Sequence, residues 1–152
     1  MTQHINLDRR FWPLEPDSEN DPENIRVSVA FGLEQDLSWD DLLSKRRVVI
    51  LAEPGTGKTE ELRATAERLR SEGKPAFFCR IEFLQNMNIE DTFDIGTQSE
   101  FRDWLQGDQE GYFFLDSVDE ALLTSRSGFE IALRRFSSGL GQSMDRAKVI
   151  VS

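Results

Sequence analysis

The sequence is poor in the residues from which redox and metal sites are commonly built. Its 152 residues include one cysteine, Cys79, and one histidine, His4. A single cysteine cannot form an internal disulfide. One histidine close to the start leaves no His/Cys cluster for zinc and no Cys–His pair for nucleophilic catalysis. The composition therefore disfavours these site classes and fits a reducing, cytoplasmic setting.

Long apolar runs and an excess of positive charge are also missing. No run of about 18 apolar residues occurs, and residues 1–17 contain acids and prolines where a signal peptide needs an apolar segment. The 28 Asp and Glu against 18 Lys and Arg give a formal net charge of −10. We therefore expect no membrane partner. A nucleic-acid partner is disfavoured because a negative field repels phosphate backbones.

The length of the chain suits one domain, and the composition of the sequence changes twice along it. Residues 1–24 hold three of the five prolines and a series of acids, which predicts an extended acidic arm. In residues 25–47, the alternation over residues 25–31 predicts a short strand, and Ser38 is typical of the N-cap of a short helix. We expect the folded core to span residues 48–152.

Within that core, apolar strand patterns alternate with helical ones. Strands are expected at residues 48–51, 76–83, 112–115 and 149–151, the first of them β-branched and covered on both faces. Helices are expected after residue 59 up to Gly73, from an N-cap at Ser99 to Gly107, and from a capping box at Ser127 to Leu140. Residues 84–98 show no clear period. This alternation predicts an α/β fold with a mostly parallel sheet between two helical layers.

The strongest motif follows the first core strand and fits a phosphate-binding loop in which an alanine replaces the first glycine. It consists of Ala52, Glu53, Pro54, Gly55, Thr56, Gly57, Lys58 and Thr59. Gly55 and Gly57 let the backbone turn its N–H groups toward phosphate oxygens at the start of a helix. Lys58 would reach the β- and γ-phosphates, and the Thr59 hydroxyl would bind Mg²⁺. The motif predicts a nucleotide site.

A second motif, residues 113–120, is an apolar strand that ends in a carboxylate. Asp116 is expected at the carboxyl edge of the sheet, where it would hold Mg²⁺ through a water molecule, within about 5 Å of the Thr59 hydroxyl. Glu120 or Asp119 would polarise the attacking water. The alternative is that Asp119 and Glu120 are merely acids in the first turn of a helix.

These two motifs make the chain resemble the STAND class of P-loop ATPases, and NACHT-type members most of all. Asp116-Ser117-Val118-Asp119-Glu120 matches the second motif of that family at every position. The resemblance covers residues 48–152. It implies a P-loop NTPase three-layer sandwich, ATP or ADP with Mg²⁺, and a switch role in signalling or defence. It also implies that the last strand, residues 148–151, inserts between the strand before the loop and the strand that ends in Asp116.

Family members continue past this last strand with a sensor residue, a fifth strand and helical domains. We therefore expect the chain to be the N-terminal part of a longer protein, with its core truncated after the fourth strand. The longer protein would self-associate or bind a protein partner. We expect the ATPase activity to belong to it, and the fragment to be inactive because closure and a charge-stabilising arginine are missing.

Two other functions fit the same motifs. A regulatory module could bind ADP or ATP without hydrolysing it. A P-loop phosphotransferase is disfavoured because Asp119 and Glu120 suit water activation and no arginine-rich lid is evident. Among the remaining residues, Cys79, Phe101 and Trp104 are expected in the core. Arg134 and Arg135 are expected to be solvated, the alternative being a finger toward a neighbouring subunit's nucleotide.

Overall fold

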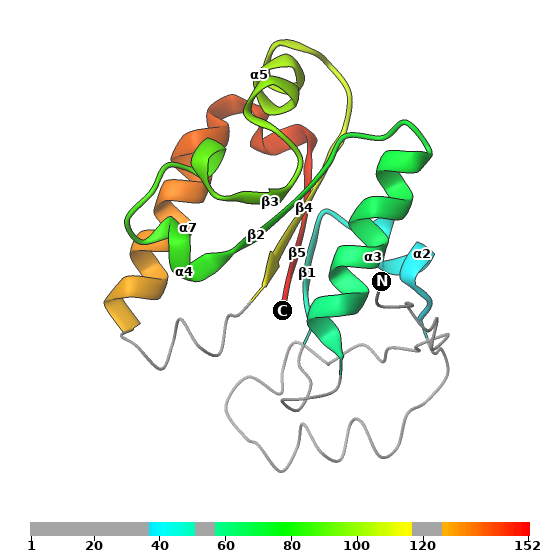
Figure 1. Ribbon diagram of the computed structural model, residues 1–152, viewed down its shortest axis with the longest axis horizontal. Helices are drawn as coiled ribbons and strands as arrows, with labels where there is room; N and C mark the ends of the chain where they lie inside the picture. Colours follow the sequence, from blue (N-terminus) through cyan, green and yellow to red (C-terminus); the bar gives the residue numbers. More distant parts are fainter. Residues whose placement is uncertain (1–36, 51–56, 117–125) are drawn as a thin grey trace. The chain divides into compact units, whose positions relative to one another are not determined.

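The computed structural model describes residues 37–50, 57–116 and 126–152 (Figure 1), without the side chain of Arg126. The chain consists of two compact units, Met1–Lys45 and Arg46–Ser152. In the first unit, helix α2 (Trp39–Leu43) begins after Ser38. The Ser38 hydroxyl accepts a hydrogen bond from the Asp41 amide at 3.3 Å, and Asp41 Oδ2 accepts one from the Ser38 amide at 2.8 Å. This capping box confirms the helix predicted there.

The described residues of the second unit form one five-stranded, mostly parallel sheet. Its strands are β1 (Arg47–Val49), β2 (Ala76–Arg80), β3 (Phe93–Ile95), β4 (Gly111–Asp116) and β5 (Ala147–Val151). They lie in the order β1-β5-β4-β2-β3, and only the β2–β3 pair is antiparallel. The last strand therefore does insert between β1 and β4, as the resemblance implied.

Helices cover both faces of the sheet (Figure 1). Helix α3 (Lys58–Ser71) lies on one face, while α4 (Ile81–Leu84) and α7 (Arg126–Leu140) lie on the other. The predicted stripe of Leu62, Ala66 and Leu69 is buried along α3. The remaining elements are α5 (Gln98–Gln106) and the short 3-10 helices η2 (Ile89–Asp91) and η3 (Gly141–Arg146). The chain is therefore an α/β protein of the expected layered kind.

Aromatic rings fill the core on the α7 side. The ring of Phe113 stacks on Phe77 at 5.1 Å between centroids and meets Trp104 and Phe136 edge-on at 5.0 and 5.6 Å. Such pairs add about 0.5–1.5 kcal/mol each beyond the apolar area that they bury. Phe101 joins them, so the prediction that Phe101 and Trp104 belong to the core is confirmed.

Some predicted boundaries are wrong. The second strand ends at Arg80 instead of residue 83, because Ile81 and Leu84 bury their side chains at the three-residue spacing of the helix α4. Residues 84–98, which show no period, contain η2 and β3. Each of these spans only three residues, too few to give a period.

The predicted helix caps shift as well. The cap of α5 is Thr97 and not Ser99, because Thr97 forms a capping box with Glu100. The structure describes helix α7 from Arg126 onward, so Ser127 lies inside its first described turn. A capping motif read from sequence is easily displaced by one turn or less when several Ser and Thr residues lie close together.

The first core strand is not covered on both faces. Strand β1 has three residues and pairs on one side with β5, and the Val49 side chain is 66% exposed. Within the described residues β1 is an edge of the sheet. An apolar run shows that a strand is suited to burial, but its neighbours decide whether it is buried.

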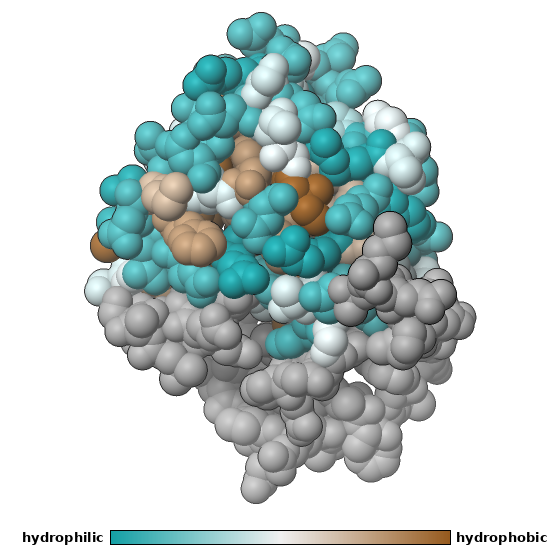
Figure 2. All heavy atoms as spheres, in the orientation of Figure 1, coloured by the Kyte–Doolittle hydropathy of each residue, from teal (hydrophilic) through white to brown (hydrophobic). Residues whose placement is uncertain are grey.

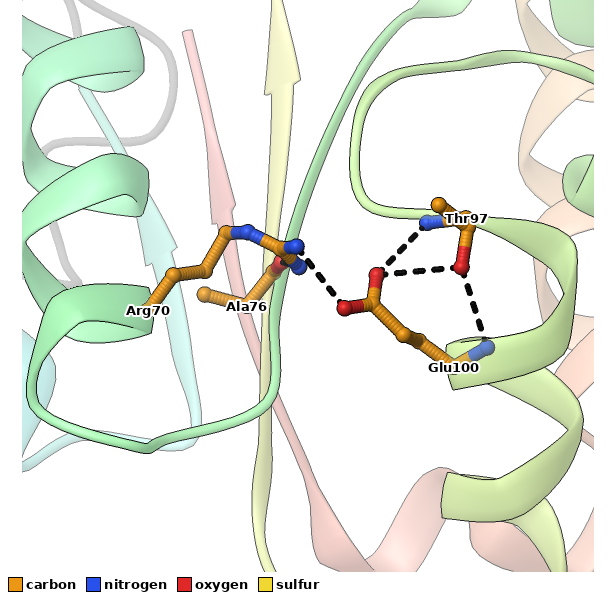
Figure 3. Close-up of polar contacts among 4 residues, drawn as sticks. All are labelled: Arg70, Ala76, Thr97 and Glu100. Atoms are coloured by element: carbon orange, nitrogen blue, oxygen red, sulfur yellow. Dashed lines mark hydrogen bonds and ion pairs between the residues drawn. The ribbon is translucent and has the colours of Figure 1, made fainter.

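An ion pair joins α3 to α5 across the amino end of the sheet (Figure 3). Arg70 Nη2 lies 2.8 Å from Glu100 Oε1, and Arg70 Nη1 donates to the Ala76 carbonyl at 3.3 Å. Glu100 Oε2 accepts the Thr97 amide at 2.8 Å. The hydrogen bond from Arg70 lowers the pKa of Glu100.

None of the helices in the described ranges has the length and apolar character that a membrane crossing requires.

Candidate functional site

The candidate site lies where α3 begins. Gly57 precedes the helix with φ of 81°, in the left-handed region that glycine adopts most easily, and the helix starts at Lys58 as the motif requires. Glycine has no side chain to cap the first turn, so the orphan backbone N–H groups there are not satisfied by an N-cap side chain. Residues 52–56 of the predicted loop lie outside the described residues.

The site brings together two residues that are far apart in the sequence. Thr59 Oγ1 donates a hydrogen bond to Asp116 Oδ2 at 2.7 Å, across a separation of 57 residues. Asp116 is the last residue of β4 and is buried, 4% exposed. The predicted proximity of these two side chains is therefore confirmed. Asp119 and Glu120, the predicted catalytic residues, lie outside the described residues.

The paired oxygens fit the coordination chemistry of Mg²⁺. A hydroxyl and a carboxylate are hard oxygen donors, and Mg²⁺ in nucleotide sites takes one or two protein oxygens and keeps water and phosphate in its other positions. Among the described residues no group of three or more His, Cys, Asp or Glu side chains converges. The Thr59 and Asp116 oxygens thus suit a Mg²⁺ ion whose remaining positions are filled by water and phosphate.

Ser152 lies at the same edge of the sheet and is buried. The sequence predicted no role for it. It follows β5 directly, and its amide donates to the Leu115 carbonyl at 2.9 Å. Its side chain is buried, and Oγ has no hydrogen-bond partner in the part of the chain that the structure describes. A small polar residue just after an apolar strand, the pattern that singled out Asp116, would have indicated it.

Arg80 was also missed. It ends β2 and is the register partner of Asp116, so both residues lie at the carboxyl edge of neighbouring strands. Its guanidinium lies 3.9 Å from Glu82 Oε1 and 3.8 Å from Asp94 Oδ2, and Nε has no hydrogen-bond partner within the described ranges. Asp94 is held more tightly by Arg63 on α3, at 2.7 Å. A cation therefore lies one strand away from the Thr59–Asp116 pair.

Cys79 does not take part in chemistry at this site. Its side chain is buried in the core, and burial raises the pKa of its thiol to about 12. A thiol with this pKa is protonated at neutral pH, and the thiolate is the nucleophilic form. The prediction that Cys79 is a small core side chain is confirmed.

Neither a family model nor a curated protein matches this chain.

Proposed function

We propose that this chain binds ATP with Mg²⁺ as the nucleotide-binding core of a P-loop ATPase of the STAND class with NACHT-like motifs. The hydrogen bond between Thr59 and Asp116 carries the proposal. A hydroxyl at the start of a helix and a carboxylate at the end of a neighbouring strand are the two protein oxygens that a nucleotide-bound Mg²⁺ requires.

The strand order supports the same class of fold. In the common dinucleotide-binding and flavodoxin-like orders the first two strands are neighbours. Here β5 and β4 separate β1 from β2. Strands β1 and β4 flank β5 and are thus about 9.5 Å apart, twice the spacing of adjacent strands. The loop after β1 and the carboxylate after β4 would then share one binding site above the end of β5.

Each residue at this edge would have a separate task. The backbone N–H groups of residues 55–59 and the Lys58 ammonium would bind the phosphates. Thr59 and Asp116 would hold Mg²⁺, which supplies positive charge against the β- and γ-phosphate oxygens when it is bound. Glu120 or Asp119 would orient the attacking water and accept its proton.

The biological role that we propose is a cytoplasmic signalling or defence switch. ATP and ADP differ in the γ-phosphate, so loops that contact this group can be ordered in one state and released in the other. Self-association or binding of a protein partner would depend on whether ATP or ADP is bound.

Two measurements on the purified chain test the proposal. Calorimetry with MgATP should show binding that Lys58→Ala weakens. Phosphate release by the purified chain should be at or near background, and any release above it should be abolished by Glu120→Gln and unchanged by Glu130→Gln, a control at an exposed carboxylate of α7. Equal MgATP affinity for wild type and Lys58→Ala would overturn the nucleotide site. Turnover of several per second that Glu120→Gln abolishes would contradict the expectation that the fragment is inactive.

A further inference from the structure

The face of the second unit that carries α4 and α7 exposes apolar side chains. The described residues include four large apolar side chains that are exposed, and three of these are Phe83, Met87 and Ile131, at 40%, 38% and 43%. Phe83 belongs to α4, Met87 follows it closely, and Ile131 belongs to α7, which packs against α4. Figure 2 shows apolar side chains gathered over α4 and α7, at the left of the view. This clustering is typical of an interaction surface.

A groove of about 510 Å³ lies beside Ile131, between α7 and the segment that contains η2 and α5. The exposed Ile131 and the half-buried Leu105 give it accessible apolar surface, and the buried Ile89 and Phe101 lie beneath them. At Gly139 an added Cβ would lie 2.5 Å from Ile89 Cγ2, so α7 approaches η2 closely there. The groove is thus shaped by backbone packing, and it has room for an apolar side chain of a ligand.

The rim of the groove is positively charged. Arg134 and Arg135 line it, and neither has a hydrogen bond or an ion pair among the contacts of the described residues. The carboxylate of Glu90, which also lines it, is neutralised by Arg102, with Nε and Oε2 3.1 Å apart. The only acid of α7, Glu130, does not line the groove. Arg134 and Arg135 therefore create a locally positive field on a chain whose net charge is −10.

We propose that this groove binds a segment of another protein in which an aliphatic or aromatic side chain is flanked by carboxylates. The apolar side chain would cover Ile131 and Leu105, and the carboxylates would pair with Arg134 and Arg135. A free phosphate would satisfy the arginines but leave the Ile131 side chain exposed to water. The groove lies on the α7 face, and Thr59 belongs to α3 on the opposite face, so the proposal does not depend on nucleotide binding.

A random-peptide library selected on the full chain tests this proposal. Counter-selection would use a variant with Ile131→Asp, Arg134→Glu and Arg135→Glu. Because all three side chains are exposed, the variant should keep its melting temperature. We expect the enriched peptides to combine a large apolar residue with Asp or Glu within one helical turn. Enriched peptides without an acidic bias, or none that distinguishes the two proteins, would overturn the proposal.

Affinities of one labelled, enriched peptide, measured by fluorescence polarisation, provide the quantitative test. We expect the double variant Arg134→Glu/Arg135→Glu to weaken peptide binding about tenfold or more, and the single variant Ile131→Ser to do the same. We also expect peptide binding by the wild type to weaken as salt is added. Arg68→Glu, an exposed arginine on α3, is the matched control and should bind like wild type. Equal affinity for the Arg134/Arg135 reversal would overturn the proposal. Self-association of the wild type that the triple variant loses would also overturn it, because a second copy would then be the occupant.

Discussion

Thr59 on α3 and Asp116 at the end of β4 are joined by a hydrogen bond of 2.7 Å. The two residues come from the two segments that carry the motifs of the sequence, and only the folded sheet brings them into contact. Asp116 is buried, so the Thr59 hydroxyl satisfies a carboxylate that would otherwise be costly to bury.

Replacing Thr59 by valine should therefore destabilise the protein even without ligand. The change removes the hydroxyl and leaves a buried carboxylate oxygen unsatisfied, which costs about 1–3 kcal/mol. Thr59→Ser, which keeps the hydroxyl, should stay close to wild type. Chemical denaturation of the three proteins checks this, and equal stability of the valine and serine variants would contradict the contact.

Replacing Lys58 by alanine should weaken MgATP binding. Losing one charge-assisted contact to phosphate costs roughly 1.5–3 kcal/mol, or about ten- to a hundredfold in affinity. Calorimetric titration with MgATP measures the change. Lys74→Ala is the control, because Lys74 lies beyond the far end of α3 and pairs with Glu72 at 3.0 Å. A similar loss in both variants would argue against a specific phosphate contact.

The Ser152→Ala substitution tests whether the Ser152 hydroxyl contributes to the stability of the protein or to its affinity for MgATP. The Ser152 hydroxyl is buried and has no partner among the described residues, so its removal should leave the melting temperature unchanged or raise it. If the hydroxyl meets a nucleotide oxygen, MgATP affinity should fall about two- to tenfold, the equivalent of one neutral hydrogen bond. Thermal melts with and without MgATP measure both effects. A lower melting temperature without ligand would show a structural role.

Glu100→Gln should lower stability at neutral pH by about 0.2–1 kcal/mol, the range for an exposed ion pair. Glutamine can keep the capping box with Thr97, so the charge paired with Arg70 is the main loss. The pKa of Glu100 is lowered in the folded state, so its contribution is present above the unfolded value of about 4.3 and is lost as the pH falls through the folded pKa. Urea denaturation across this range should show the difference disappear in acid; a difference that persists there would have another cause.

Gly96→Ala should destabilise the protein more than Gly73→Ala. Both glycines have positive φ, 98° and 80°, so alanine costs about 1–2 kcal/mol at either position. At Gly96 the new Cβ would also lie 2.5 Å from Cδ1 of the buried Phe77, whereas no atom lies within 4 Å of it at Gly73. This overpacking should add about 1–3 kcal/mol, measured by thermal denaturation. Equal losses would show that the Phe77 ring moves without cost.

Patterns within short stretches of the sequence predicted most of the helices and strands and both motifs. The apolar stripe of α3, the capping box at Ser38 and the apolar run that ends in Asp116 are each determined by neighbours in sequence, through side-chain periodicity and backbone hydrogen bonding. Elements shorter than one helical repeat, such as β3, carry no such period and could not be found in this way.

The sequence by itself determined the alternation of strands and helices and the chemical types at the candidate site, because these depend on periodicity and residue identity within short windows. The tertiary structure alone decided that Val49 is exposed, that Ser152 is buried beside β4 and that Arg80 lies in register with Asp116. It also decided that Arg134 and Arg135 border an apolar groove. Strand neighbours and helix faces are set by packing between distant segments, and no local window contains that information.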